Sequence, residues 1–503
     1  MPTKLDRRHA PLNLSAAEFR ELGHALVDRI AAFYESLPTR PITRGLGPKD
    51  IRALIGDTAL PETGTDPAAL LAEFAPLHFD NSLHNGHPRF MGYITSSAAP
   101  LGALGDLLAA AVNSNVGAWD LSPVATEIER QTIRWIAELV GYPSGCGGIL
   151  VSGGNMANFL GFYAARRAKA PWDIRETGLY GDPRRLTVYA SDATHTWLQK
   201  AADLSGIGID NVRWIASDHR QCMRLDELEA RIAADRNAGH LPFLVVGAAG
   251  TVSTGTVDRL PAIAAICKRE SLWFHVDGAY GAPAASLPEA DAELKGLGLA
   301  DSVALDPHKW LYSPIEAGCT LVRAPEHLTD AFSFRPAYYK FEGEEEDPRI
   351  NFYEYGMQNT RGFRALKVWL ALRTIGREGY VRMIRDDIAL ARRLHAHAIA
   401  HPELEAFTCE LSIVTFRYRP RALEGSPAAV EAYLDELNDE LLTRLQGGGE
   451  AYVSNAVLEG RKLLRACIVN FRTTADDIDA IPEIVVRLGR EVDREQRPAA
   501  TLG

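Results

Sequence analysis

The sequence has few cysteines, no long apolar run and no excess of basic residues. Its six cysteines are far apart, with no C-x-x-C pair and no histidine at zinc-finger spacing, so we expect reduced thiols and no metal. No segment approaches the ~18 apolar residues of a membrane span, and the N-terminus lacks the apolar stretch of a signal peptide. A net charge of −11 argues against a nucleic-acid surface. We therefore expect a cytoplasmic protein that acts on a small molecule and has no nucleic-acid or membrane partner.

What is present is an ordinary globular composition. Hydrophobic residues make up 46% and charged residues 24% of the 503 residues, so neither disorder nor a fibrous repeat is indicated. A chain of this length is too long for one small core. It suggests two or three domains, one of them large.

Residues 1–99 are predicted to form a helical segment that cannot fold alone. Ser15 stands three residues before Glu18, which is the pattern of a capping box, and large apolar residues then recur at helical spacing. Pro38 ends this helix, and links that contain proline and glycine follow as far as about Pro100. Since the segment has too little core of its own, we expect it to pack on something else, such as a second subunit.

Residues 100–366 alternate short apolar strands with helices. The candidate strands are GILVSG, RLTVYASD, NVRWIA, FLVVGAAGT, LWFHVDGAYG, DSVALD and GCTLVRA. That alternation predicts an α/β fold, in which a mostly parallel sheet has helices on both faces and binds ligands beyond the carboxyl ends of its strands. Residues 367–503 continue with a long helical stretch and three strand-like runs, which predicts a smaller C-terminal α+β domain.

Two of these strands lead into groups that can react. DSVALDPHKW places Lys309 just past one strand, and FHVDGAYG delivers Asp277 to the end of another. A lysine in such a place is usually only a surface charge, and an acid beside it only an ion pair. Together, however, they are what a pyridoxal phosphate site requires. The lysine forms a Schiff base with the cofactor, and the carboxylate keeps the pyridine nitrogen protonated.

This interpretation needs a phosphate-binding turn and a flat group beside the cofactor ring. GILVSGGNMAN runs from a strand through Ser152 and Gly153 into a helix, whose exposed N–H groups can face a dianion. His195, in SDATHTW, follows another strand at the start of a helix, where an imidazole can cover the ring and exchange protons. Each signal alone is weak, because a Gly-Gly turn is usually only a turn and a lone histidine is usually structural.

In this order along the chain, NGHPRFMGY, ILVSGGNMAN, SDATHTW, HVDGAYGAPAA and DPHKW resemble the group II pyridoxal-phosphate-dependent amino-acid decarboxylases. This family contains the aromatic-L-amino-acid, histidine and glutamate decarboxylases. The resemblance extends from about residue 15 to about residue 485. It implies a pyridoxal-phosphate transferase type I fold, an L-amino acid substrate and an obligate homodimer with exchanged N-terminal helices.

The resemblance implies a role for each matching position. Lys309 carries the cofactor, Asp277 pairs with its ring nitrogen, and His195 stacks on the ring as a catalytic group. The other cofactor contacts it implies are Ala279 under the ring, Ser152, Gly153, His308 and Asp306 at the phosphate, and Thr251 nearby. Aromatic decarboxylases usually have asparagine where this chain has Asp306. An acid beside a phosphate is unfavourable unless a proton or a cation intervenes.

Loss of carbon dioxide must be followed by protonation at the substrate Cα, which needs a positioned acid. In the aromatic decarboxylases this acid is a tyrosine on a mobile loop, and the matching position is Tyr338, beside Tyr339, in a stretch that we interpret as a lid. The implied substrate-binding positions are Tyr93, Ile94, Ser96 and Gly117. Those enzymes usually have a phenylalanine from the partner subunit where this chain has Gly117, so a larger pocket is expected. The predicted reaction converts an aromatic L-amino acid to its amine and carbon dioxide.

Three alternatives stay open. A decarboxylase of glutamate, aspartate or cysteine sulfinate needs a cationic partner for the distal carboxylate, and the sequence does not place an arginine in the pocket. An aldehyde synthase of the same family would oxidise the substrate with oxygen, but those enzymes usually alter the catalytic tyrosine or the stacking histidine, both of which are present here. A catalytically silent scaffold is disfavoured because Lys309, Asp277 and His195 are all retained.

Overall fold

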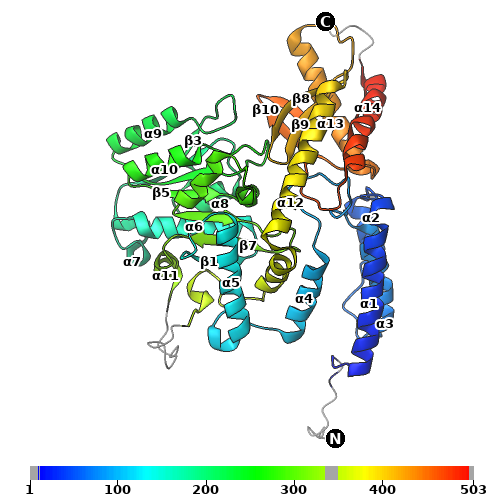
Figure 1. Ribbon diagram of the computed structural model, residues 1–503, viewed down its shortest axis with the longest axis horizontal. Helices are drawn as coiled ribbons and strands as arrows, with labels where there is room; N and C mark the ends of the chain where they lie inside the picture. Colours follow the sequence, from blue (N-terminus) through cyan, green and yellow to red (C-terminus); the bar gives the residue numbers. More distant parts are fainter. Residues whose placement is uncertain (1–9, 11, 335–348, 498–503) are drawn as a thin grey trace, which may run out of the picture.

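The computed structural model describes residue 10 and residues 12–334 and 349–497, which are organised around two sheets (Figure 1). The first helices are α1 (Ala16–Ser36), α2 (Pro48–Ile55) and α3 (Pro67–Asn81). The expected capping box starts α1, since the Glu18 N–H donates to Ser15 Oγ at 3.2 Å and the Ser15 N–H donates to Glu18 Oε2 at 2.7 Å. No residue of α1 is buried. α1 and α3 lie side by side at the right of the view, with the large sheet at the left.

The large sheet has the strand order β1-β7-β6-β5-β4-β2-β3. Its strands are β1 (Gly147–Val151), β2 (Leu186–Ser191), β3 (Val212–Ile215), β4 (Leu241–Ala248), β5 (Trp273–Asp277), β6 (Ser302–Leu305) and β7 (Gly318–Val322). β7 runs antiparallel to both β1 and β6, and the other neighbours pair in parallel. Each strand corresponds to one of the seven predicted runs, and the α/β architecture is confirmed.

Helices cover both faces of this sheet. They are α5 (Pro123–Leu139), α6 (Gly154–Lys169), α8 (Trp197–Leu204), α9 (Leu225–Asn237), α10 (Leu260–Arg269) and α11 (Glu326–Phe332). Two further helices in this part of the chain, α4 (Pro100–Val112) and α7 (Ile174–Thr177), pack elsewhere. Along β4, Leu244 and Val246 belong to a core cluster with α6 and α8, whereas Val245 belongs to a cluster with α5, α9 and α10. Alternate strand residues point to opposite faces, so the sheet is buried on both sides.

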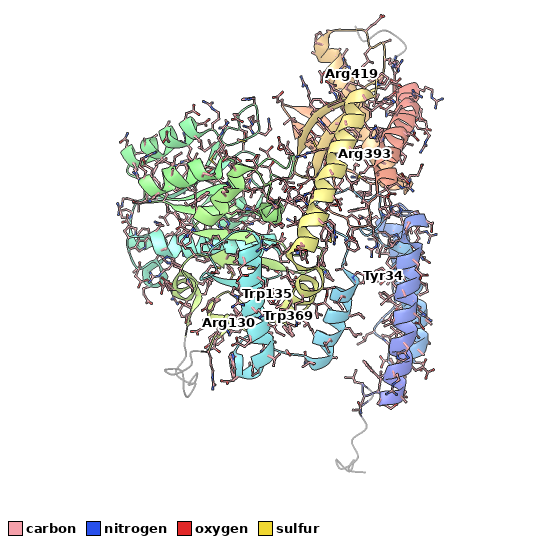
Figure 2. All side chains as sticks on the ribbon, in the orientation of Figure 1. Tyr34, Arg130, Trp135, Trp369, Arg393 and Arg419 are labelled. Atoms are coloured by element: carbon pink, nitrogen blue, oxygen red, sulfur yellow. The ribbon has the colours of Figure 1, made fainter. Side chains whose placement is uncertain are left out.

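α12 (Ala365–Ala400) consists of two helical stretches joined by a kink at Gly376, and it runs between the large sheet and a second sheet (Figure 1). Trp135 of α5 and Trp369 of α12 stack with ring centroids 6.1 Å apart, which joins the two helices (Figure 2). The second sheet is antiparallel, in the order β10-β11-β9-β8. Its strands are β8 (Leu404–Glu410), β9 (Ile413–Tyr418), β10 (Ser454–Leu458) and β11 (Arg461–Cys467), accompanied by α13 (Pro427–Gly448) and α14 (Ala475–Gln496). β8, α13 and α14 were not expected from the sequence.

Within residues 12–334 and 349–497, no helix combines the length and the apolar character that crossing a membrane requires. In the same part of the chain, no three His, Cys, Asp or Glu side chains are grouped so that they could bind a metal ion.

Candidate active site

A cavity of about 440 Å³ opens at the carboxyl ends of the parallel strands. Ten of the residues singled out in the sequence line it: Ile94, Ser152, Gly153, His195, Thr251, Asp277, Ala279, Asp306, His308 and Lys309. They come from the ends of β1, β2, β4, β5 and β6 and from the chain before α4. Strand ends of a parallel sheet share one edge, which is why residues far apart in the sequence meet here.

Lys309 lies in the turn after β6, with its Nζ 3.0 Å from Asp306 Oδ2. Asp306 is 1% exposed, and its other oxygen is buried without a hydrogen-bond partner among the described residues. Burial lowers the pKa of Lys309, but the Asp306 carboxylate, which accepts a hydrogen bond from the amine, raises it, and the net direction is upward. The two side chains therefore form a partly buried ion pair, in which the Asp306 carboxylate stabilises the charged form of the Lys309 amine.

Asp277 ends β5, and both of its carboxylate oxygens accept hydrogen bonds. Trp197 Nε1 donates to Oδ2 at 2.8 Å, and the Ala279 N–H donates to Oδ1 at 3.2 Å. Trp197 is fully buried at the start of α8. Sequence reasoning missed its role, although it stands two residues after His195 in a motif that was otherwise recognised. These two donors fix the direction in which Asp277 faces the cavity.

The imidazole of His195 lines the same cavity. Its Nδ1 accepts a hydrogen bond from the Trp197 N–H at 3.2 Å. Burial lowers the pKa of His195, and the neighbouring lysines Lys309 and Lys200 lower it further. The ring is therefore neutral near pH 7, and because Nδ1 accepts, the ring proton is assigned to Nε2.

The turn between β1 and α6 supplies groups suited to an anion. Ser152 and Gly153 line the cavity, and α6 begins at Gly154, so the unpaired N–H groups of its first turn lie at the cavity wall. A Cβ on Gly154 would lie 2.6 Å from Asp306 Oδ2, which explains the glycine. His308 adds a ring whose Nδ1 lies 2.7 Å from the Ala317 carbonyl oxygen.

This donor set fits pyridoxal phosphate. An amine for the aldehyde, a carboxylate for the ring nitrogen and a helix N-terminus for the phosphate line one cavity, whose volume is in the range of cofactor sites. Asp306 is a carboxylate close to the turn that would hold the phosphate, and its charge opposes an anion there. Its distance of 3.0 Å from Lys309 shows that the amine offsets that charge.

Three described residues singled out in the sequence, Tyr93, Ser96 and Gly117, are not among those that line the cavity. Tyr93 is 52% exposed, with its hydroxyl 3.3 Å from that of Tyr452. Ser96 is buried and donates to the His308 carbonyl oxygen at 2.9 Å, so it supports the turn that carries Lys309. Gly117 lies in the loop that follows α4, beside the backbone of Asn359. Tyr338 lies outside the described residues.

The glycine at position 117 has a local structural reason. A Cβ there would lie 2.2 Å from the backbone oxygen of Asn359, so a larger residue would not fit without a shift of that backbone. A role for Gly117 in substrate binding stays a prediction.

Arg465 of β11 is a further group near the cavity that the sequence did not reveal. It is 4% exposed, its Nη1 donates to the Val252 carbonyl oxygen at 2.6 Å, and Val252 lines the cavity. Its Nε has no partner, and no carboxylate pairs with it in the part of the chain that the structure describes. A buried guanidinium without a counter-ion is a candidate partner for an anionic ligand.

The fold and this set of groups define a pyridoxal-phosphate enzyme. Residues 48–419 match the family model described as the pyridoxal-dependent decarboxylase conserved domain, and the chain belongs to this family of carboxy-lyases.

The chain is similar to enzymes that act on aromatic substrates. It is 34% identical to an aromatic-L-amino-acid decarboxylase of Bacillus atrophaeus, over 96% of this chain and 97% of that protein. It is 29% identical to a phenylacetaldehyde synthase of Arabidopsis thaliana, over 90% and 92%. A crystal structure of Oryza sativa TDC with PLP and tryptamine superposes with a TM-score of 0.88 at 29% identity, covering 96% of this chain and 99% of that one.

Proposed function

We propose that the protein removes the α-carboxylate of an aromatic L-amino acid, giving the amine and carbon dioxide. The observation that carries this proposal is the convergence of Lys309, Asp277 and the N-terminus of α6 on one cavity. The aromatic class is supported by the Bacillus relative and by the Oryza structure that contains tryptamine.

Pyridoxal phosphate, when bound, supplies a carbonyl carbon for the substrate amine and a ring that accepts electrons as carbon dioxide leaves. Lys309 would anchor it through its amine, and Asp306, 3.0 Å away, orients that amine and offsets its positive charge. Asp277, oriented by the indole of Trp197, holds a proton at the ring nitrogen. His195 would stack on the ring, and because its Nδ1 accepts from the Trp197 N–H, its Nε2 would carry the proton available for exchange.

The acid that returns a proton to Cα is proposed to be Tyr338. This assignment rests on the family resemblance. The remaining cofactor contacts are proposed for Ala279, Ser152, Gly153, His308 and Thr251, all of which line the cavity. Ile94, at the cavity wall, is proposed to contact the substrate side chain, together with Tyr93, Ser96 and Gly117.

We also propose a homodimer. Large apolar side chains are exposed on α1, α3 and α4: Phe19, Val27, Leu70, Phe74, Leu101, Leu104, Leu107, Leu108 and Val112. Exposed apolar surface of this extent is typical of an interface. Residues 1–99 are then the exchanged segment, 100–366 the cofactor domain and 367–503 the small domain. All six cysteines are free thiols, which supports a reducing compartment and so the cytoplasm.

A second candidate function is decarboxylation of an acidic amino acid, and Arg465 is the observation that favours it. Its buried guanidinium has no carboxylate partner among the described residues. An amino acid with a distal carboxylate would supply one.

The test is a panel of substrates. The purified protein with pyridoxal phosphate is given L-tryptophan, L-tyrosine, L-phenylalanine, L-DOPA, L-glutamate, L-aspartate and cysteine sulfinate, and carbon dioxide, amine, aldehyde and hydrogen peroxide are measured. The proposal requires amine from at least one aromatic acid and none from Lys309→Ala. Turnover of only the acidic substrates would replace it by the second candidate, and aldehyde with peroxide would make the protein an oxidative synthase.

A further inference from the structure

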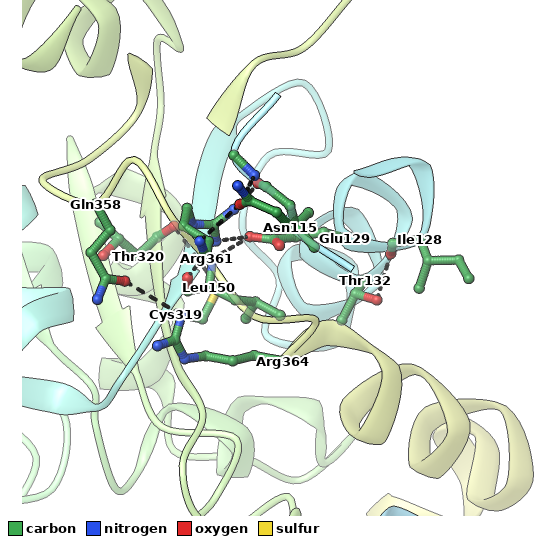
Figure 3. Close-up of polar contacts among 12 residues, drawn as sticks. Asn115, Ile128, Glu129, Thr132, Leu150, Cys319, Thr320, Gln358, Arg361 and Arg364 are labelled. Carbon is green, nitrogen blue, oxygen red and sulfur yellow. Dashed lines mark hydrogen bonds and ion pairs between the residues drawn. The ribbon is translucent and has the colours of Figure 1, made fainter. Parts of the chain in front are cut away.

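β1 lies at the edge of the large sheet and pairs only with β7. An edge strand leaves backbone N–H and C=O groups without a strand partner. At Leu150 both groups are bonded by side chains instead (Figure 3): the N–H donates to Glu129 Oε1 at 3.0 Å, and the carbonyl oxygen accepts from Arg361 Nη2 at 2.7 Å.

Glu129 and Arg361 form a buried ion pair. Arg361 Nη2 lies 2.5 Å from Glu129 Oε1, and the side chains are 1% and 0% exposed, respectively. Glu129 comes from α5, and Arg361 lies just before α12. The arginine also donates through Nη1 to the Val116 carbonyl oxygen at 2.9 Å and through its backbone N–H to Asn115 Oδ1 at 3.0 Å. One guanidinium thus joins α5, β1 and the loop before α5.

Stability alone does not account for this pair. Burying two charges costs desolvation, and a well-packed apolar pair is often equally stable or more so. Here Glu129 Oε2 and Arg361 Nε are also buried without a hydrogen-bond partner among the described residues. The hydrogen bonds of the pair therefore do not fully offset the cost of removing its two charges from water. What the pair does achieve is to replace a missing neighbouring strand at one position of β1.

Leu150 is next to the turn between β1 and α6, which is the proposed phosphate-binding turn. β1 ends at Val151, and Ser152 and Gly153 follow at the cavity wall. The turn is also confined from the β7 side, since a Cβ on Gly318 would lie 2.6 Å from the Gly153 backbone. The ion pair and β7 hold the end of β1 from its two edges.

We propose that Arg361 and Glu129 are positioning residues for the phosphate-binding turn. Neither lines the cavity, and they act by fixing the Leu150 backbone, which aims Ser152 and Gly153. This inference rests on the proposed function, because it takes that turn as the site of the cofactor phosphate. Loss of the pair then weakens the part of cofactor affinity that depends on the phosphate and spares the part that depends on Lys309.

The experiment compares two ligands that differ only in the phosphate. The full chain, freed of cofactor, is titrated with pyridoxal phosphate and with pyridoxal, and both dissociation constants are measured by absorbance. The variants are Arg361→Lys, which loses the planar fork that bonds Leu150 and Val116, and Glu129→Gln, which keeps an oxygen for the Leu150 N–H. The matched control is Arg417→Lys, a buried arginine of β9 that pairs with Glu405 and Glu431 away from the cavity.

In Arg361→Lys the affinity for pyridoxal phosphate is expected to fall about tenfold to hundredfold, as for other residues that orient a ligand-binding group. The affinity for pyridoxal is expected to change by less than about threefold. Glu129→Gln keeps the oxygen that accepts from the Leu150 N–H but leaves Arg361 without its counter-charge, so its loss of pyridoxal phosphate affinity is expected to be smaller than that of Arg361→Lys and likewise specific to the phosphate. Arg417→Lys is expected to leave the ratio of the two constants unchanged. Equal losses for both ligands in Arg361→Lys, or none, would overturn the inference.

A measurement on the wild type covers the case in which Arg361→Lys does not fold. The Leu150 amide is expected to resist hydrogen exchange as strongly as β1 amides bonded to β7, and rapid exchange of an open edge would refute the positioning role. The outcomes are separable from failure of the proposed function. If the wild type binds neither ligand, the proposed function is refuted. If the wild type binds both ligands and Arg361→Lys loses the same affinity for each, only the positioning role is refuted.

Discussion

Asp387 of α12 offers a direct test of how the turn that carries Lys309 is supported. The carboxyl group is 3% exposed, and its Oδ2 accepts hydrogen bonds from Trp310 Nε1 at 2.8 Å and from the Tyr312 hydroxyl at 2.7 Å. Burial raises the pKa of Asp387 to about 7, although both hydrogen bonds oppose this shift. The small domain's helix therefore holds the residues that follow Lys309 through a carboxyl group that is protonated in mildly acidic solution.

The sign of the stability effect follows from proton binding. In the unfolded chain this carboxyl ionises above about pH 4, whereas in the folded protein it keeps its proton up to about pH 7. Between these values the folded state binds one more proton, so the free energy of unfolding falls as pH rises. About three pH units at roughly 1.4 kcal/mol each give a loss of about 4 kcal/mol. Asp387→Asn keeps an oxygen for both donors but does not titrate.

Urea unfolding of the holoenzyme at pH 5, 6, 7 and 8 measures this effect. Relative to the wild type, Asp387→Asn is expected to gain about 2 kcal/mol in the free energy of unfolding between pH 5 and pH 7, because the wild-type carboxyl is half ionised at the upper pH. Glu378→Gln, an exposed position on the same helix, serves as the control and should follow the wild type. If the difference in the free energy of unfolding between Asp387→Asn and the wild type changes by less than about 1 kcal/mol over this pH range, the carboxyl is already ionised in the folded protein and the reasoning fails.

Two further predictions concern the chemistry. Trp197→Phe removes the indole donor to Asp277 and is expected to lower kcat/KM about tenfold or more, since a hydrogen bond to a charged group contributes about 1.5–3 kcal/mol. Trp273→Phe, whose indole bonds a serine, should be milder, and equal losses in the two variants would mean that packing alone is responsible. Tyr338→Phe is expected to release amine about a hundredfold more slowly, because a general acid is lost, and to divert turnover under air toward aldehyde, ammonia and hydrogen peroxide. If Tyr338→Phe makes amine at the wild-type rate while Tyr339→Phe does not, the wrong tyrosine has been chosen.

The sequence predicts the large sheet well because each of its strands is a short apolar run bounded by turn residues. Once the strands are recognised, the topology of a parallel sheet brings Lys309, Asp277, His195 and Ser152 to one edge without further information. The family resemblance adds their roles. In that part of the chain the strand-like runs after the long helical stretch were predicted, whereas the helices α13 and α14 were not.

Partners that meet only in the fold could not be predicted in this way. Trp197 donates to a carboxylate 80 positions away, and Arg361 bonds Glu129 across 232 positions. No local pattern marks either pair, since a buried tryptophan and a helical glutamate are common in any core. The close approach of the Asn359 backbone to Gly117 is likewise a contact between distant parts of the chain that no local pattern marks.

Reductive trapping tests the central claim most directly. The holoenzyme is treated with borohydride, which makes the bond between the cofactor and its lysine permanent, then digested and mapped by mass spectrometry. The account predicts a pyridoxyl group on Lys309 alone, and no label in Lys309→Ala. A label on any other lysine, or none on a protein that still produces amine, would contradict the assignment of the active site.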